Sequence, residues 1–261
     1  MRTMTAHTGR PVDLGGLLWT LVRTDFKSRY HGTAGGFAWA LLKPALMFLV
    51  LMGVFSFVFA SAPRYPLNLI VGLFLWDFFS ESTKAGLISL HTKGYLLTKA
   101  PFPSWILVVA STSNAVITLC VFVFALLGYL AAAGQAPSLG GVALFVIYLA
   151  LYYLIVVGFC LGGSVLFLKY RDLNQVWDVA TQAGFFIAPI IYPLDILPER
   201  VHLYLYAWPP TPILQFSRAV LVEDTIPTLT AHLLLLLMTG VIVAVGVTIF
   251  RAFAPDAAEN L

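Results

Sequence analysis

Hydrophobic positions along the chain gather into long runs instead of alternating with polar positions. Six such runs cover residues 37–60, 68–83, 104–133, 139–168, 179–194 and 229–250. A helix of about 20 apolar residues crosses the roughly 30 Å of bilayer hydrocarbon. Backbone groups in lipid must be satisfied within the protein, which favours helices. The pattern therefore predicts an all-α membrane protein with six transmembrane helices in a single domain over residues 37–252.

The fifth run and the segment after it are unusual. Residues 179–194 are few for a span, and Pro189 and Pro193 fall near their end. The following residues, 195–228, are too apolar and aromatic for a solvated loop and too interrupted for a span. Irregular backbone at membrane depth is tolerated where protein shields it from lipid. We therefore predict a re-entrant helical hairpin over 195–228 that dips back from the outer side, between the fifth and sixth spans.

Charged residues are few and unevenly distributed. The chain is 60% hydrophobic and 10% charged, against about 45–50% and about 25% in soluble domains. With the N-terminus inside, twelve of the 15 lysines and arginines lie on inner segments, and only Arg64, Arg200 and Arg218 lie outside. Cytoplasmic loops carry this excess, so the net charge of +3 reports orientation and indicates no nucleic-acid partner. Both termini, residues 1–36 and 253–261, are predicted to be cytoplasmic.

A basic helix is expected before the first span. Leu21, Val22, Phe26 and Tyr30 recur at helical spacing beside basic residues. This pattern is typical of an amphipathic helix that lies flat on the cytoplasmic interface, and a solvated basic tail is the alternative. Residues 84–103, between the second and third spans, combine helix-forming residues with three lysines. They predict a short helix that leaves the membrane, turns and returns.

Sequence motifs for catalysis and metal binding are absent. The chain contains no G-x-x-x-x-G-K-[ST], H-E-x-x-H, C-x-x-C or G-x-S-x-G. The five histidines are scattered, and Cys120 and Cys160 lie inside apolar runs, where they are interpreted as small packing residues. We therefore expect no catalytic residue, no metal site and no cofactor bound by this chain, which is not expected to be an enzyme by itself.

One acidic residue falls inside a predicted span. Asp77 belongs to the second run, and Glu81 follows it by one turn on the same face. Acids within the membrane often mark ion pathways, so Asp77 is expected either in a channel or interface, or near the headgroups if the span ends early. A single acidic pair gives only weak support for a proton relay. Transport against a gradient would then depend on a separate ATPase at the cytoplasmic side.

The stretch from residue 29 to residue 59, RYHGTAGGFAWALLKPALMFLVLMGVFSFVF, resembles the first-span signature of ABC-2 type permeases that export polysaccharides. The matching positions are Arg29, Tyr30, Gly36, Trp39 and Pro44. Four more stretches resemble the same family in the same order: GLFLWDFF, LLTKAPFPSW, LKYRDLNQV, and IAPIIYPLDILP with WPPTPILQFSRAVL. The resemblance extends from Arg23 to Val222, and the order of the motifs is more specific than any one of them.

The resemblance implies the permease subunit of an ATP-driven exporter in the bacterial inner or plasma membrane. Its cargo would be a lipid-linked cell-envelope polysaccharide of the O-antigen, teichoic acid or galactan type, moved from the cytoplasmic to the outer face. A homodimer would join two copies of a cytoplasmic ABC ATPase, which binds ATP and magnesium. An ABC-2 exporter of a drug or small lipid is an alternative, as are an ion-coupled secondary transporter and a scaffold without transport activity.

The resemblance and the residue chemistry together assign three groups of site residues. The ATPase interface and coupling residues, on the N-terminal helix, the 84–103 segment and the loop after the fourth span, are Arg23, Phe26, Lys27, Arg29, Tyr30, His91, Lys93, Tyr95, Arg171 and Asp172. Rings can stack on the C–H faces of sugars without requiring charge. The glycan-channel residues are therefore Phe48, Phe55, Phe59, Trp76, Asp77, Phe185, Phe186 and Tyr192. The outer-gate residues are Pro189, Pro193, Trp208 and Pro209.

Overall fold

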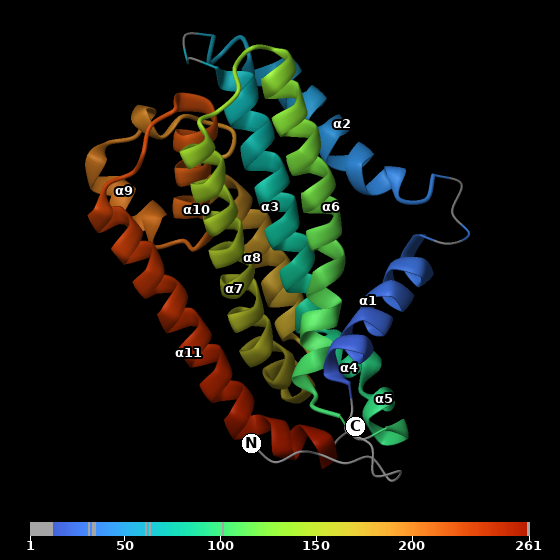
Figure 1. Cartoon of the computed structure of the whole chain (residues 1–261). Helices are drawn as coiled ribbons and strands as arrows, with labels where there is room; N and C mark the ends of the chain where they lie inside the picture. Colours follow the sequence, from blue (N-terminus) through green and yellow to red (C-terminus); the bar gives the residue numbers. More distant parts are fainter. Residues whose placement is uncertain are drawn as a thin grey trace.

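The computed structural model describes residues 13–30, 32, 35–60, 62, 64–100 and 102–259, with side chains up to residue 254. These residues form helices joined by short turns, with no strand among them (Figure 1). The prediction of an all-α membrane protein is therefore confirmed. Residues 1–12 of the predicted cytoplasmic N-terminus lie outside the described residues, as do His31 and the last two residues of the predicted tail.

Four helices are long and apolar enough to cross a membrane. They are α2 (Ala38–Phe55), α6 (Trp105–Ala132), α7 (Leu139–Lys169) and α11 (Leu229–Glu259), the last of them apolar as far as Ala254. Each begins within a residue or so of a predicted run. α2 is shorter than predicted, because residues 56–60 form turns. α11 is longer, since its helix continues past residue 250.

Two further helices depart from the predicted limits of the second and fifth runs. α3 (Tyr65–Leu87) is 23 residues long and therefore takes in Lys84, which was assigned to the loop that follows. Pro66 fits its first turn because no N–H is needed there. α8 (Leu173–Ile187) begins and ends earlier than predicted. It ends because Ala188, which precedes Pro189, adopts the extended conformation that proline imposes on its neighbour.

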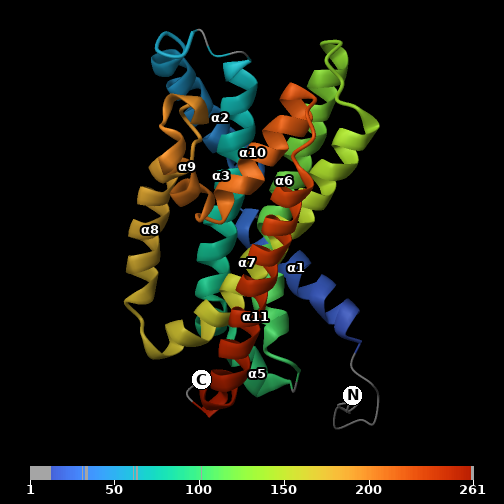
Figure 2. The ribbon, with the colours of Figure 1, turned by 90° about the vertical axis from the view of Figure 1, so that its left-hand side faces the viewer.

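α3 lies at the centre of the bundle. It packs against α2, α6, α7, α8 and α10 (Pro210–Arg218), and Figures 1 and 2 show α6 and α7 running beside it. Leu69 and Leu75 are completely buried, and most of the helix is buried with them. Burial on most sides is typical of the central helix of a bundle, and the charged residues of α3 lie toward the cleft or in ion pairs. The indole of Trp177 in α8 donates a 2.9 Å hydrogen bond to the hydroxyl of Thr83 in α3.

α11 packs along α7 through glycines. A Cβ atom on Gly158 of α7 would lie 2.8 Å from the Cα of Val243, and one on Gly246 of α11 would collide with the carbonyl of Gly158. Small residues let helix backbones approach closely, which is how many helices pair in membranes. The α7–α11 pair therefore depends on the absence of side chains at these two positions.

Short helices lie at both ends of the bundle. α1 (Leu14–Tyr30), α4 (Ser89–Lys93) and α5 (Tyr95–Lys99) occupy one end. At the opposite end, η1 (Leu194–Ile196), α9 (Glu199–Tyr206), α10 and the π-helical turn η2 (Ala219–Glu223) connect α8 to α11 (Figure 2). α10 is buried along almost its whole length against α3 and α7. The segments that connect α8 to α11 form part of the wall of a pocket.

Candidate functional site

An open cleft lies between α2 and α8, over α3. It encloses about 910 Å³. Four predicted channel residues, Trp76, Asp77, Phe185 and Phe186, line it together. The ring of Trp76 lies 6.1 Å from that of Phe185, and Phe186 is 67% exposed on the cleft side of α8. The structure thus brings half of the predicted channel residues into one space.

The polar groups of the cleft lie on α2, α3 and α8. Asp77 is half-buried in the cleft wall, and Lys43 and Lys84 line the same space. The ammonium of Lys84 lies 2.8 Å from a carboxylate oxygen of Asp178 in α8, so this ion pair joins two walls of the cleft. Glu81, one turn beyond Asp77, pairs with Arg29 of α1.

The remaining predicted channel residues do not line the cleft. Phe48 packs against the bundle core. The rings of Phe55 and Phe59 stack with centroids 6.1 Å apart, and Phe59 packs 5.4 Å from Tyr65. The two residues were expected on one helix face, but Phe59 lies in the turn after α2 and its ring contacts Tyr65 of α3. Tyr192 lies beyond the end of α8 and lines a different space.

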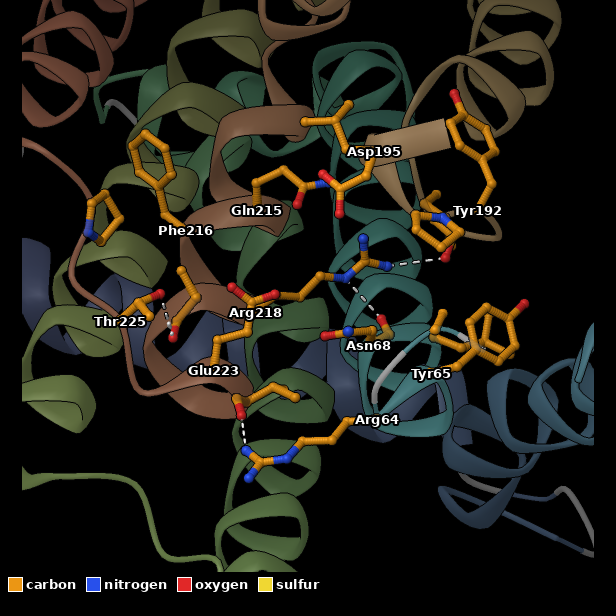
Figure 3. Close-up of a pocket in the computed structure, with 18 of the residues that line it drawn as sticks. Arg64, Tyr65, Asn68, Tyr192, Asp195, Gln215, Phe216, Arg218, Glu223 and Thr225 are labelled. Carbon is orange, nitrogen blue, oxygen red and sulfur yellow. Dashed lines mark hydrogen bonds between the residues drawn. The ribbon is translucent and has the colours of Figure 1, made fainter. Parts of the chain in front are cut away.

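That second space is a pocket between the start of α3, the segment after α8, α10 with η2, and the loop before α11 (Figure 3). This pocket encloses about 650 Å³ and is called the outer pocket here because it lies beside the predicted outer-gate residues. The hydroxyl of Tyr192 donates to the carbonyl oxygens of Phe186 and Ile187, at 3.2 and 2.9 Å. Burial, and secondarily the carboxylates of Asp195 and Glu223, raise the pKa of Tyr206 above its ordinary value. The polar residues around the pocket are Arg64, Asn68, Tyr192, Asp195, Tyr206, Gln215, Arg218, Glu223 and Thr225.

Arg218, at the end of α10, connects three segments behind the outer pocket. Its side chain is buried, and its guanidinium donates to the carbonyl oxygens of Asn68 at 2.9 Å, Pro189 at 2.5 Å and Ile190 at 3.0 Å. Gly72 leaves room for it, because a Cβ atom there would lie 2.5 Å from a guanidinium nitrogen. From the sequence, Arg218 was expected only to be a positive charge on the outer side. The sequence feature that could have identified its structural role is that it is the only charged residue between Pro209 and Val222.

The predicted outer-gate residues surround the same region. The carbonyl of Pro189 accepts the Arg218 hydrogen bond, and Pro193 lines the outer pocket. Pro209 caps the start of α10. The ring of Trp208 lies 6.5 Å from Trp76 and so connects this region to the wall of the cleft.

The predicted interface residues on α1 are held to the bundle by ion pairs. Lys93 of α4 pairs with Asp25 of α1 and also donates to Ser111 of α6 at 2.7 Å. Arg29 pairs with Glu81 of α3. The rings of Phe26 and Tyr30 pack with Phe37, with centroids 4.8 to 5.5 Å apart. Ion pairs thus hold α1 to α3 and α4, helix packing holds it to α6, and the aromatic contacts hold it to Phe37 just before α2.

The other predicted interface residues present exposed polar or aromatic groups. Tyr95 on α5 is 55% exposed. His91 on α4 is exposed and meets the ring of Phe167 edge-on, with centroids 5.8 Å apart. The exposed charged residues are Arg23, Lys27, Arg171 and Asp172, the last two in the turn between α7 and α8. Within the described part of the chain, no cluster of histidine, cysteine and acidic side chains could hold a metal ion.

Long apolar helices around a buried central helix, with a cleft open between α2 and α8, are the architecture of a polytopic α-helical membrane protein. The chain belongs to the ABC-2 type transporter family, whose profile matches residues 16–222. It is 30% identical over 256 residues to the O-antigen export system permease protein RfbA of Myxococcus xanthus, covering 94% of this chain and 95% of the relative. It is 25% identical to the RfbA of Klebsiella pneumoniae, with the same coverage.

A less similar relative is named for the transport of a different cargo. The chain is 21% identical over 231 residues to the polysialic acid transport protein KpsM of Escherichia coli, covering 87% of this chain and 89% of the relative. The profile match begins inside α1 and ends inside η2. The cleft and most of the outer pocket therefore lie within the part of the chain that defines the family.

Proposed function

We propose that the chain is the transmembrane permease subunit of an ATP-driven exporter for a lipid-linked cell-envelope polysaccharide. The observation that carries this proposal is the match along nearly the whole chain to relatives named as O-antigen export permeases. The O-antigen class of cargo is favoured over teichoic acid or galactan by those names. The exporter would move the polysaccharide from the cytoplasmic to the outer face of the bacterial inner membrane.

The chemistry of the cleft supports a sugar cargo that is tethered to lipid. Trp76, Phe185 and Phe186 offer ring faces on which the C–H faces of sugars can pack, and packing of this kind lets a chain slide. The cleft is open between α2 and α8 instead of being closed on all sides. A lipid anchor can therefore remain in the bilayer while the sugar lies in the cleft. Apolar drugs would also suit such a wall, but no relative reported above is named for one.

We further propose that two copies of the chain assemble and work with two copies of a separate ABC ATPase. Val50 of α2 and Phe186 of α8 are each more than half exposed beside the cleft, and a second copy facing them would supply its missing wall. The sequence carries no P-loop, so ATP and magnesium would bind the partner ATPase. α1, α4, α5 and the turn at Arg171 and Asp172 are the surfaces proposed to contact it.

The proposed topology has six spans, with α3 and α8 added to the four long apolar helices. α1 then lies along the cytoplasmic interface, and both termini are cytoplasmic, as the distribution of lysine and arginine favours. α9 and α10 form the outer re-entrant hairpin. The burial of α10 against α3 and α7 supports this reading, because irregular backbone at membrane depth requires a protein partner.

Depletion of the chain in its own cells tests the proposed function. The expected result is loss of surface polysaccharide together with accumulation of lipid-linked polysaccharide inside the cell, both reversed by re-expression. Unchanged surface polysaccharide, with nothing accumulating inside, would refute the proposal. A photocrosslinker at Phe186 should label the polysaccharide during turnover, whereas one at Phe124, which is 76% exposed on α6 away from the cleft, should label lipid only.

A further inference from the structure

α1 has a side that the described part of the chain leaves exposed. Val22 is the one fully buried residue of this helix, and Trp19 is 67% exposed. Figure 2 shows the N-terminal end of α1, where Trp19 lies, extending away from the bundle. Tryptophan is highly buried on average in folded proteins. The exposed side of α1 is therefore a candidate surface for contact with another molecule.

One side of α1 is aromatic along most of its length. Trp19, Phe26 and Tyr30 follow one another at intervals of seven and four residues, so they share a side of the helix. The rings of Phe26 and Tyr30 contact the ring of Phe37, just before α2. Trp19 lies two turns before Phe26, toward the end of α1 that leaves the bundle. The aromatic side is therefore packed on protein at one end and exposed at the other.

A cationic side lies next to the aromatic side of α1. Arg23 follows Trp19 by four residues and Lys27 follows Arg23 by four, and both cations are exposed. Four residues exceed one turn of 3.6 residues, so each step lies a little further around the helix. The exposed hydroxyl residues Thr20 and Thr24 lie beyond Lys27 in the same direction. The side chains of α1 therefore change from rings to cations and then to hydroxyl groups around its axis.

The acidic residues of α1 do not neutralise the exposed cations. Asp25 is the single acid within the helix, and its carboxylate pairs with Lys93 of α4 on the bundle side. Asp13 precedes the helix and accepts hydrogen bonds from the N–H groups of Gly15 and Gly16, each at 3.1 Å. Its charge therefore lies at the N-terminus of α1, about 15 Å along the axis from Arg23 at 1.5 Å per residue. The exposed side of α1 remains positively charged.

This order of side chains matches the layers of a bilayer surface. Tryptophan is enriched at the level of the headgroups, where its ring lies against the start of the acyl chains. Phosphate groups lie just outside that level, and anionic lipids make the cytoplasmic leaflet attractive to lysine and arginine. Water lies beyond them and suits hydroxyl groups. Both the charge of the exposed side and the sequence of its layers are complementary to an anionic lipid surface.

We propose that the side of α1 formed by Trp19 and Arg23 binds the headgroups of anionic phospholipids in the cytoplasmic leaflet. This inference rests on the proposed topology, which places α1 along that leaflet. Lys27 lies further toward water and is left to face the ATPase. The lipid contact holds the N-terminal end of α1 at the membrane surface, whereas the ion pairs of Asp25 and Arg29 hold its second half to the bundle.

Photocrosslinking tests this inference in the complete complex with the ATPase, in nanodiscs of equal parts phosphatidylglycerol and phosphatidylcholine. A benzophenone amino acid in place of Trp19 should capture about fivefold more phosphatidylglycerol than phosphatidylcholine, the equivalent of about 1 kcal/mol. Arg23→Gln should reduce this ratio to about one. Arg251→Gln, which removes an exposed cation from α11, is the control and should leave the ratio unchanged. The same probe in place of Thr24, on the hydroxyl side, should capture no lipid.

A second measurement keeps the native tryptophan. Quenching of Trp19 fluorescence, taken as the difference between the wild type and Trp19→Phe, should be stronger with brominated phosphatidylglycerol than with brominated phosphatidylcholine in the same mixture. The inference is overturned if the probe at residue 19 captures the ATPase and no lipid, if the two lipids are captured or quench equally, or if Arg23→Gln keeps the wild-type ratio. None of these readouts involves the cargo, so the depletion experiment decides the proposed function separately.

Discussion

The guanidinium of Arg218 donates a 2.5 Å hydrogen bond to the carbonyl oxygen of Pro189, 29 residues earlier in the chain. Pro189 follows the residue at which α8 stops being helical. Backbone carbonyls at the end of a helix lack partners within the helix. A side chain from α10 therefore satisfies the backbone just beyond the end of α8, and it also binds the carbonyl of Asn68 in α3. The end of the bundle that holds α9 and α10 is therefore stabilised by this one cation.

Arg218→Met should strongly destabilise the protein. The substitution keeps much of the side-chain volume but leaves three carbonyls without their donor, at a cost of about 3 kcal/mol or more. Thermal unfolding of the purified protein should show a large decrease in midpoint. Arg200→Met, at an exposed position on α9, is the control and should leave the midpoint unchanged. Equal stability of the two variants would contradict the structural role of Arg218.

Gly246→Ala should loosen the pairing of α7 with α11. The new methyl group would collide with the carbonyl of Gly158, and overpacking of this kind costs about 1–3 kcal/mol. Gly240→Ala in the same helix is the matched control, because nothing lies within 4 Å of its added carbon. Alanine favours helix over glycine, so the control should be neutral or slightly stabilising. The ratio of folded to aggregated protein after heating in detergent measures the difference.

The ion pair between Asp25 and Lys93 should couple α1 to the bundle. Both side chains are about four-fifths buried, so the pair should be worth about 1 kcal/mol or more in a double-mutant cycle of Asp25→Asn and Lys93→Met. The single variants should still insert but should hydrolyse ATP, in complex with the ATPase, without matched export. α1 is also expected to contact the ATPase, and Lys27→Met, on its exposed face, tests that contact. This variant should reduce binding of the ATPase to the permease.

Gly35 and Gly36 should be essential to the connection between α1 and α2. A side chain at Gly35 would collide with the indole of Trp39, and Gly36 has a φ of +46°, which favours glycine. The double substitution Gly35→Leu with Gly36→Leu should therefore separate ATP hydrolysis from export while leaving the protein in the membrane. Gly53→Leu, whose added carbon meets nothing within 4 Å, is the control. Normally coupled export by the double variant would show that this connection transmits no motion.

Asp77→Asn should leave export nearly unchanged, in contrast to inactivation of the ATPase. The amide has the size and polarity of the carboxylate, and the neighbouring Glu81 is neutralised by Arg29. An ion-coupled secondary transporter would lose transport on removal of this charge. Uptake of radiolabelled precursor into surface polysaccharide measures the rate. Loss of export in a stably inserted Asp77→Asn protein would favour ion coupling over an ATP-driven mechanism.

Charge-free apolar runs predicted three helices closely, because composition alone decides whether a segment prefers lipid. α6, α7 and α11 begin at or next to the predicted residues. The limits of α3 and α8 were less predictable, since both depend on partners. α3 extends to Leu87 because tertiary packing buries its polar end, including Ser82 and Thr83. α8 begins at Leu173, before its sequence becomes strongly apolar.

The candidate site was likewise predictable in part from the sequence and in part only from the packing of the helices. Ring residues could be identified from sequence, but periodicity describes one helix at a time and does not say which helices are neighbours. Trp76 and Phe185 meet because α3 packs on α8, whereas Phe55 packs against the core and stacks on Phe59. Arg218 was missed because its acceptors lie 28, 29 and 150 residues away. Only the fold brings those carbonyls together.

The acceptors of Arg218 also bear on how the protein is made. Asn68, Pro189 and Ile190 all precede Arg218 in the chain, so they have been synthesised by the time the ribosome adds the arginine. α3 provides one acceptor and, together with α7, covers α10; both helices have then already left the translation site. An arginine without partners in the hydrocarbon would be costly. Here the three carbonyl groups that accept its hydrogen bonds are already present in the chain. Synthesis from the N-terminus thus provides each partner before the group that needs it, and a circular permutant that begins at α9 would reverse this order.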